Sequence, residues 1–300
     1  MNKSAPIRRV TDRWFALSGN LRGIALISLG TILFSLTDIA VKTLGNAYHP
    51  YQLSLIRYIV GFAMLAPIFW GMGLDGLKTR RAGLHVVRLA LATLAQLGFF
   101  ISVIELKLAD ATALMFSKPL FTTLVATIVL HELVSARRWT ATAVGFAGVV
   151  VMMRPGAGSF DPVMLVAVGA AMSFAVANVI IRLMSSTEPP NRILFYYHVG
   201  GIGLLLIPAL YEWRMPTGID WLLLALVGFL TTLGMICWVR AFSVGEANAI
   251  GPMEYVRLIY AGLFGYFLFG EAIDLWTVAG GVIIVGSALF ITRDEARRKG

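Results

Sequence analysis

Five charged residues lie inside stretches of the sequence that are otherwise apolar: Asp38, Arg57, Lys118, Glu254 and Arg257. A charge within the hydrocarbon of a bilayer is costly, so it is usually retained where it has a partner or a function. Three cations and two acids can pair with one another or bind a charged small molecule. The set therefore indicates recognition of a charged ligand, with structural ion pairing as the alternative.

Of the five, Lys118 lies deepest in its apolar run. It is found in the stretch ALMFSKPLFTTLVATIVLHE (113–132). It follows the start of its apolar run at Leu108 by ten residues, which places it about 15 Å into a helix. A lysine side chain reaches only part of that distance, so we expect it to face the interior. Pro119 removes a helical hydrogen bond and predicts a kink near Met115. A charge beside a kink favours a binding site over a structural ion pair.

The first apolar run carries one polar stripe, in which residues follow each other at spacings of three and four. We expect the stripe to line a cavity; the alternative is a hydrogen-bonded seam between helices. Arg57 lies about two turns into the next run, and an Asp38–Arg57 pair is geometrically reasonable. Alternatively, Arg57 extends its side chain to the membrane surface. The stripe consists of Ser28, Thr31, Ser35, Asp38 and Lys42.

The composition requires a nonpolar environment for most of the chain. Of the 300 residues 58% are hydrophobic and 14% charged, whereas soluble domains have about 25% charged residues. Cys237 is the only cysteine, so an intrachain disulfide and a cysteine metal site are excluded. The four histidines have no metal-ligand spacing, and no nucleotide-binding or nucleophile motif occurs. We expect no metal, no cofactor and no catalytic residue.

The elements that must position the five charges are membrane-spanning helices. Short breaks rich in Gly and Pro separate apolar runs of about the length that crosses a bilayer. An N-terminal segment (1–21) precedes them, and a basic tail (293–300) follows them. The fifth run is the shortest. Ten spans are predicted, at 22–43, 50–72, 84–104, 108–130, 138–153, 162–184, 192–212, 219–241, 247–269 and 276–292.

The sequence contains two related halves, residues 22–156 and 157–292. TDIAVK (37–42) matches ANVIIR (177–182), and the run ending LHE at 132 matches the run ending FGE at 271. Five helices in each half would place the halves in opposite orientations, as in many secondary transporters. This alignment also puts Arg257 opposite Lys118. A pair of equivalent cations facing one cavity explains this better than a local Glu254–Arg257 ion pair, which remains the alternative.

The basic residues predict the orientation of these spans. The chain has 25 Lys and Arg residues. Apart from Arg57, Lys118 and Arg257, eighteen of them, Arg88 included, fall on the side of the N-terminus. The other side has four: Lys42, Lys107, Arg154 and Arg214. Basic residues favour the cytoplasm, so we expect both termini there. The same bias accounts for most of the net charge of +9, and no nucleic-acid partner is required.

Several stretches resemble the drug/metabolite transporter superfamily, in particular its ten-helix EamA-type members. They are LRGIALISLGTILFSLTDIAVKTL (21–44), LADATALMFSKPLFTTLVATIVLHE (108–132), RRWTATAVGFAGVVVMMRPG (137–156) and EANAIGPMEYVRLIYAGLFGYFLFGE (246–271). The resemblance implies an all-α integral membrane protein with two inverted five-helix repeats around a central cavity. It also implies a peripheral fifth and tenth helix, which form a homodimer contact in some members. Glycines in these two helices indicate either packing or dimerisation.

We therefore expect a multi-pass secondary transporter of the bacterial inner membrane that works by alternating access. The expected activity is export of a small zwitterionic or anionic metabolite. The alternative is import of a cofactor- or vitamin-like metabolite, and a membrane-embedded enzyme or a channel is less well supported. Besides the lipid bilayer, the expected partner is the small-molecule substrate. Its predicted binding residues are Asp38, Arg57, Gln96, Phe100, Lys118, Asn178, Tyr197, His198, Trp238, Glu254 and Arg257.

Overall fold

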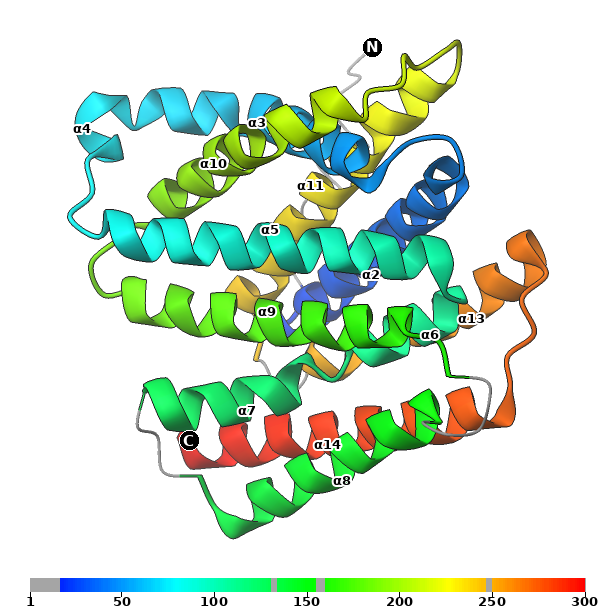
Figure 1. Cartoon of the computed structure of the whole chain (residues 1–300). Coiled ribbons are helices and arrows are strands. Elements are labelled where there is room, and N and C mark those ends of the chain that lie inside the picture. The colour runs from blue at the N-terminus through cyan, green and yellow to red at the C-terminus, as the bar shows by residue number, and fades with distance from the viewer. Residues whose placement is uncertain (1–16, 131–133, 155–159, 247–249, 300) are drawn as a thin grey trace, which may run out of the picture.

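The structure is a computed structural model that describes residues 17–130, 134–154, 160–246 and 250–299. All regular secondary structure in these residues is helical (Figure 1). The predicted boundary between the halves at 156, and Glu132 at the end of the matched LHE run, lie outside the described residues. The elements are α2 (Gly19–Gly45), α3 (Pro50–Gly71), α4 (Gly73–Leu77), α5 (Ala82–Glu105), α6 (Leu108–Met115), α7 (Lys118–Val129), α8 (Ala136–Met153), α9 (Val163–Met184), α10 (Pro190–Tyr211), α11 (Asp220–Val244), the 3₁₀ helix η1 (Gly251–Tyr255), α13 (Val256–Phe269) and α14 (Leu275–Lys299).

Local sequence signals set the helix boundaries. The Ser18 and Ser135 hydroxyls accept hydrogen bonds from backbone N–H groups in the first turns of α2 and α8, which is the usual role of an N-cap serine. Pro50 and Pro190 occupy the first turns of α3 and α10, where no backbone donor is lost. Gly270 ends α13 with a φ of 66°, a left-handed conformation that favours glycine. Helices α3 and α10, one from each half of the sequence, thus both begin with a proline.

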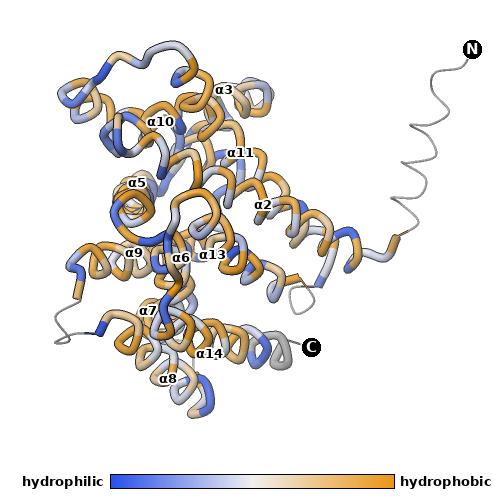
Figure 2. The backbone as a smooth tube through the Cα atoms, turned by 90° about the vertical axis from the view of Figure 1, so that its right-hand side faces the viewer, coloured by the Kyte–Doolittle hydropathy of each residue, from blue (hydrophilic) through white to orange (hydrophobic). Residues whose placement is uncertain are grey.

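Eight helical segments in the described part of the chain are long and apolar enough to cross a membrane, rather than the ten predicted. The predicted span at 138–153 is helical as α8, but this helix has only 18 residues and carries Arg137 and Arg138 in its first turn. The predicted span at 247–269 is divided into η1 and the 14-residue α13. Figure 2 shows that hydrophobic residues dominate the long helices. The chain is therefore an all-helical membrane protein.

The helices pack in pairs that join the two halves of the sequence. Helix α2 packs on α11, α5 on α9, α3 on α10, and α8 on α14. In Figure 1, α3 and α10 lie at one edge of the bundle, α8 and α14 at the opposite edge, and α5 and α9 run side by side between them. The fold thus brings residues from both halves to the same interior space.

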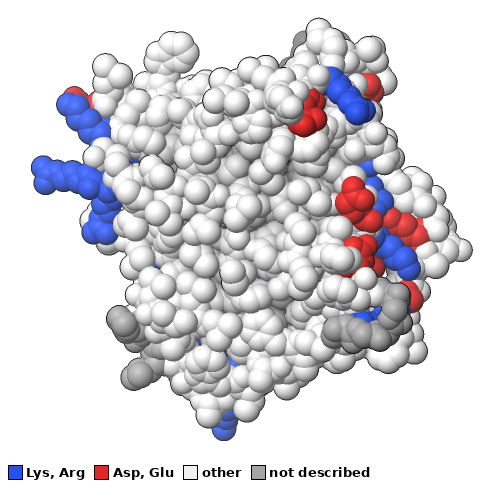
Figure 3. Space-filling model, viewed as in Figure 1, with Lys and Arg blue, Asp and Glu red and all other residues white. Residues whose placement is uncertain are grey.

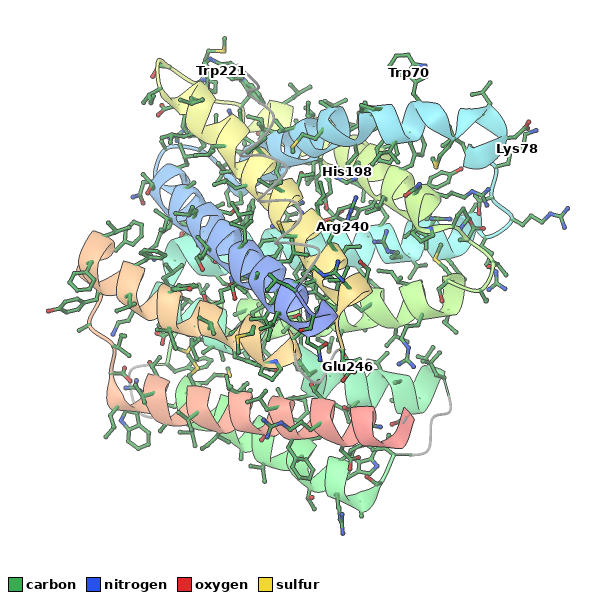
Figure 4. All side chains as sticks on the ribbon, turned by 180° about the vertical axis from the view of Figure 1, so that it is seen from behind. Trp70, Lys78, His198, Trp221, Arg240 and Glu246 are labelled. Atoms are coloured by element: carbon green, nitrogen blue, oxygen red, sulfur yellow. The ribbon has the colours of Figure 1, made fainter. Side chains whose placement is uncertain are left out.

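Charged side chains lie mainly at the two ends of the helices. On the face in Figure 3, Lys and Arg project at one end, Asp and Glu mix with Lys and Arg at the other, and a broad uncharged band separates them. Trp70 and Trp221 are 84% and 45% exposed and point away from the bundle (Figure 4). Exposed tryptophans near the ends of such a band are typical of membrane–water interfaces.

Glycines between α8 and α14 serve contacts within one chain. A Cβ atom on Gly280 would lie 2.7 Å from the Gly148 carbonyl oxygen, and one on Gly148 would lie 2.7 Å from the Ile283 side chain. These glycines therefore allow the two helices to approach closely. The glycines of α8 and α14 were expected to serve either packing or dimerisation. The structure shows packing of α8 against α14 within one chain, and the homodimer remains a prediction.

Glu188 connects two loops at the end of the bundle where α9 ends. Its carboxylate accepts hydrogen bonds from Thr79 (2.8 Å) and Arg192 (3.0 Å) and lies 3.4 Å from the His85 imidazole. Burial alone would raise the pKa of Glu188, but the hydrogen bonds from these three residues outweigh it and hold the pKa below its ordinary value. The carboxylate therefore stays ionised and keeps the loop before α5 attached to the loop before α10.

Candidate functional site

A cavity of about 390 Å³ lies between the two halves, lined by α2, α3, α5, α7, α9, α10, α11 and α13 and by the segments that precede α7 and α13. Its volume falls within the range of about 300–1,000 Å³ that is usual for small-molecule sites. Ten of the eleven residues predicted from sequence line it. They are Asp38, Arg57, Gln96, Phe100, Lys118, Asn178, Tyr197, Trp238, Glu254 and Arg257.

Asp38 pairs with Arg257, and not with Arg57 as the sequence suggests. The Arg257 guanidinium donates to both carboxylate oxygens, at 2.8 Å and 2.6 Å from Nη2 and 3.1 Å from Nε. It also lies over the Phe34 and Phe99 rings, 5.4 Å and 5.3 Å from their centroids. The local pairing failed as a prediction because α13 packs against α2 and presents a second arginine to the same carboxylate.

Arg57 has an aromatic environment. Both terminal nitrogens of its guanidinium donate to the Tyr197 hydroxyl at 3.3 Å, and its Cζ atom lies 5.0 Å from the Tyr58 ring centroid. The side chain is 8% exposed, so it does not extend to the membrane surface. Its charge is therefore held at the cavity wall.

Lys118 lies at a break between two helices. Helix α6 ends at Met115, the turn at Phe116 and Ser117 has tight 3₁₀-type hydrogen bonds, and α7 begins at Lys118. The kink predicted from Pro119 is therefore a complete break, with Pro119 in the first turn of α7. Lys118 is half-buried, and in the described part of the chain no carboxylate lies within ion-pair distance of its ammonium group.

Glu254 and Trp238 are bonded to each other within the cavity lining. The Trp238 indole N–H donates to the Glu254 carboxylate at 2.6 Å. The local Glu254–Arg257 pair considered from sequence does not form, because Glu254 bonds to Trp238 and Arg257 bonds to Asp38. Trp238 is 38% exposed, and Asn178 is exposed as well. Because both residues lie near the C-terminal ends of their helices, α11 and α9, the cavity opens toward that end of the bundle.

His198 is the predicted site residue that does not line the cavity. Its side chain is 5% exposed, and its Nδ1 atom lies 2.9 Å from the Leu194 carbonyl oxygen of the same helix. Rings of Tyr58 and Phe69 pack around it. His198 therefore belongs to the contact between α3 and α10, in the interior of the bundle (Figure 4).

Arg88 is the most important lining residue that sequence reasoning missed. It was assigned to the inner surface because it lies early in α5, but its side chain is 6% exposed and reaches the cavity. A signal was present, since Arg88 precedes Gln96 by eight residues and so shares its helix face. Aromatic residues were missed as well, and they enlarge the apolar wall. They are Phe34, Phe99, Phe116, Phe174 and Tyr255.

The cavity is closed at the end where α2 finishes. The Lys42 ammonium lies 2.8 Å from a Glu271 carboxylate oxygen and donates to the Leu106 and Val103 carbonyl oxygens. The second Glu271 oxygen accepts from the Leu108 backbone N–H at 2.7 Å. These contacts join α2, the start of α6 and the end of α13. We call Lys42 and Glu271 the closed-end pair.

A helical membrane bundle with a cavity open at one end, closed by polar contacts at the other and lined by buried charges has the design of a solute transporter. Comparison with known protein families identifies the transporter family. The EamA-like transporter family matches residues 21–154 and again residues 161–293. The chain therefore belongs to the EamA-like transporter family, as its resemblance to EamA-type proteins predicts, and it is not an enzyme.

Two named bacterial transporters are similar over most of their length. The S-adenosylmethionine uptake transporter of Rickettsia prowazekii is 31% identical over 94% of this chain and 96% of its own. The riboflavin transporter of Vibrio cholerae is 30% identical over 82% and 84%. A crystal structure with 18% identity covers 92% of this chain and 98% of its own at a TM-score of 0.64, which supports the fold.

Proposed function

We propose that this protein imports a cofactor-like metabolite across a bacterial inner membrane by alternating access. The observation that carries the proposal is the similarity, over nearly the whole chain, to relatives named as S-adenosylmethionine uptake and riboflavin transporters. Export, our first expectation from sequence, has less support than the alternative of import. The route is the central cavity, and its binding residues are the ten lining residues predicted from sequence.

The proposed architecture is ten helices in two inverted repeats, 22–156 and 157–292, with both termini in the cytoplasm. Packing supports this architecture. In the repeat, α2 corresponds to α9, α3 to α10 and α5 to α11. The contact between α2 and α11 therefore has its counterpart between α9 and α5, and the contact between α3 and α11 has its counterpart between α10 and α5. The α3–α10 and α8–α14 contacts map onto themselves. In this scheme α8 and α13 complete the ten, and the cavity is open to the cytoplasm.

The lining indicates a substrate with a planar ring and a negatively charged group. Aromatic side chains from both halves give the cavity surfaces on which a ring can stack. Four cations (Arg57, Arg88, Lys118 and Arg257) and two acids (Asp38 and Glu254) line it. A carboxylate or phosphate group on the substrate would offset these cations locally, whereas a lipophilic cation has no such group to offer.

A ligand-stabilisation screen on the purified full-length protein tests the substrate class, because a bound ligand raises the unfolding temperature. We expect S-adenosylmethionine or a flavin to raise it in a concentration-dependent manner. Lipophilic cations of similar size are the control. Stabilisation by these cations alone, with none by cofactor-like compounds, would contradict the proposal.

Alternating access predicts that breaking the closed-end pair opens the other side of the cavity. Thr37 lines the cavity and is 4% exposed, so a cysteine there should be protected from an impermeant thiol reagent added outside cells. With Cys237→Ser as background, we expect Glu271→Gln to raise the labelling rate of Thr37→Cys severalfold, because the neutral amide binds Lys42 more weakly.

The control for this labelling is Asp75→Asn, which removes a carboxylate from the exposed Asp75–Lys78 ion pair. It should leave the labelling of Thr37→Cys unchanged. If Glu271→Gln lowers the unfolding temperature but the labelling rate stays at the background level, the closed-end pair is structural and does not control access.

A further inference from the structure

Arg57 and Arg88 come together from separate helices on one aromatic side chain. The Cζ atoms of Arg57 and Arg88 lie 5.9 Å and 5.2 Å from the Tyr197 ring centroid. Helices α3, α5 and α10 each supply one of these three residues. All three side chains line the central cavity. The arrangement therefore places two guanidinium groups next to one tyrosine ring of the cavity wall.

Neither guanidinium has an acidic partner among the described residues. The two acids of the cavity are bonded elsewhere, Asp38 to Arg257 and Glu254 to the Trp238 indole. Arg57 donates to the Tyr197 hydroxyl and Arg88 to the Ile193 carbonyl oxygen. The Nε atoms of both arginines are buried without a hydrogen-bond partner. Donor capacity and positive charge thus remain unused on side chains that are more than nine-tenths buried.

Two buried and uncompensated charges are unfavourable in a protein interior. An anion would offset that cost, and the fork of a guanidinium matches the geometry of a carboxylate or phosphate. The aromatic wall beside the pair suits a ring attached to that group. We propose that Arg57, Arg88 and Tyr197 form the subsite for the anionic group of the substrate, a proposal that rests on the function above and specifies its substrate class.

This subsite differs from the cation pair suggested by the sequence repeat. That pair, Lys118 and Arg257, includes an arginine that Asp38 already neutralises. Lys118 remains available for a second polar group of the substrate, at the start of α7. The substrate class is accordingly a ring compound whose carboxylate or phosphate binds at Arg57 and Arg88.

The first test uses nicotinate and nicotinamide. These two small compounds have the same ring, but nicotinate carries a carboxylate where nicotinamide carries a neutral carboxamide. Millimolar amounts of each are added to the purified full-length protein, and the unfolding temperature is followed. We expect stabilisation by nicotinate and little by nicotinamide. In Arg88→Ala and in Arg57→Ala, the nicotinate concentration needed for the same rise in unfolding temperature should be about ten- to a hundredfold higher. Equal stabilisation by the two compounds would overturn the subsite.

Two kinds of variant guard against misfolding and general charge effects. Arg57→Lys and Arg88→Lys keep a charge without the fork, so we expect folded protein with a severalfold weaker nicotinate effect. Arg240→Ala removes an exposed arginine outside the cavity lining (Figure 4) and should change nothing. If the lysine variants fold and bind nicotinate like the unmodified protein, the subsite is wrong.

Matched cofactor pairs separate this subsite from the proposed function. Comparing the binding of S-adenosylmethionine with that of its decarboxylated analogue tests whether a carboxylate is recognised. Comparing FMN with riboflavin tests whether a phosphate is recognised. Preference for the acidic member of either pair, lost in Arg88→Ala, supports the subsite and identifies its anion. Cofactor binding without such a preference overturns the subsite and leaves the function intact. Selectivity for nicotinate without any cofactor binding leaves the subsite intact and overturns the function.

Discussion

Lys118→Ala is expected to abolish most transport while the protein stays folded in the membrane. The ammonium group lines the cavity at the first turn of α7, and no carboxylate of the described residues pairs with it. Removing it therefore breaks no structural ion pair. We expect a loss of initial rate of at least about tenfold, the effect of one hydrogen bond to a charged group, and little change in unfolding temperature. The measurement is substrate uptake into proteoliposomes.

The matched control is Lys78→Ala, since the Lys78 side chain is 79% exposed and projects from the end of the bundle (Figure 4). It should transport like the unmodified protein. Lys118→Arg keeps the charge and should retain part of the rate. If Lys118→Ala transports normally and only its unfolding temperature falls, Lys118 has a structural role and does not contact substrate.

The Asp38–Arg257 pair is expected to give the largest effect on stability. Asp38 is 2% exposed, and removal of one member of such a pair leaves a buried charge without compensation. Asp38→Ala and Arg257→Met should each lower the free energy of unfolding by about 3–5 kcal/mol and abolish transport. The double variant Asp38→Ala/Arg257→Met should be more stable than either single variant. Unfolding and uptake measurements on the three variants form a double-mutant cycle.

The two readouts of this cycle separate structure from function. We expect the double variant to recover stability but not transport, because the pair contributes polar groups to the cavity. Recovery of transport together with stability would show that the pair only holds α2 against α13. Additive losses of stability in the double variant would contradict the ion pair itself.

Much of the fold follows from local sequence signals. Length and hydrophobicity are local properties, so the long helices and their order could be predicted from the sequence. Pro119 beside Lys118 correctly indicated a disruption in mid-helix, because a proline cannot donate to the preceding turn. The division of 247–269 into η1 and α13 was missed, although Gly251 and Pro252 lie in η1 and both disfavour a regular helix.

The partners of the site residues were harder to predict, because they depend on contacts between distant segments. Asp38 and Arg57 are near each other in sequence, yet α13 brings Arg257 to the carboxylate. Arg88 was counted with the surface because sequence position does not tell where a long side chain points. Tyr197 and His198 were both predicted to line the site, but successive helix residues point about 100° apart, and only Tyr197 lines the cavity.

Counterflow in proteoliposomes tests the proposed transport most directly. Vesicles with the purified protein are loaded with unlabelled S-adenosylmethionine and diluted into a trace of the labelled compound; a parallel set uses riboflavin. If the protein is an importer of this class, we expect transient, saturable accumulation of at least one labelled compound without ATP, and its loss in Lys118→Ala. Folded protein that accumulates neither compound, but exchanges a lipophilic cation, would contradict this expectation.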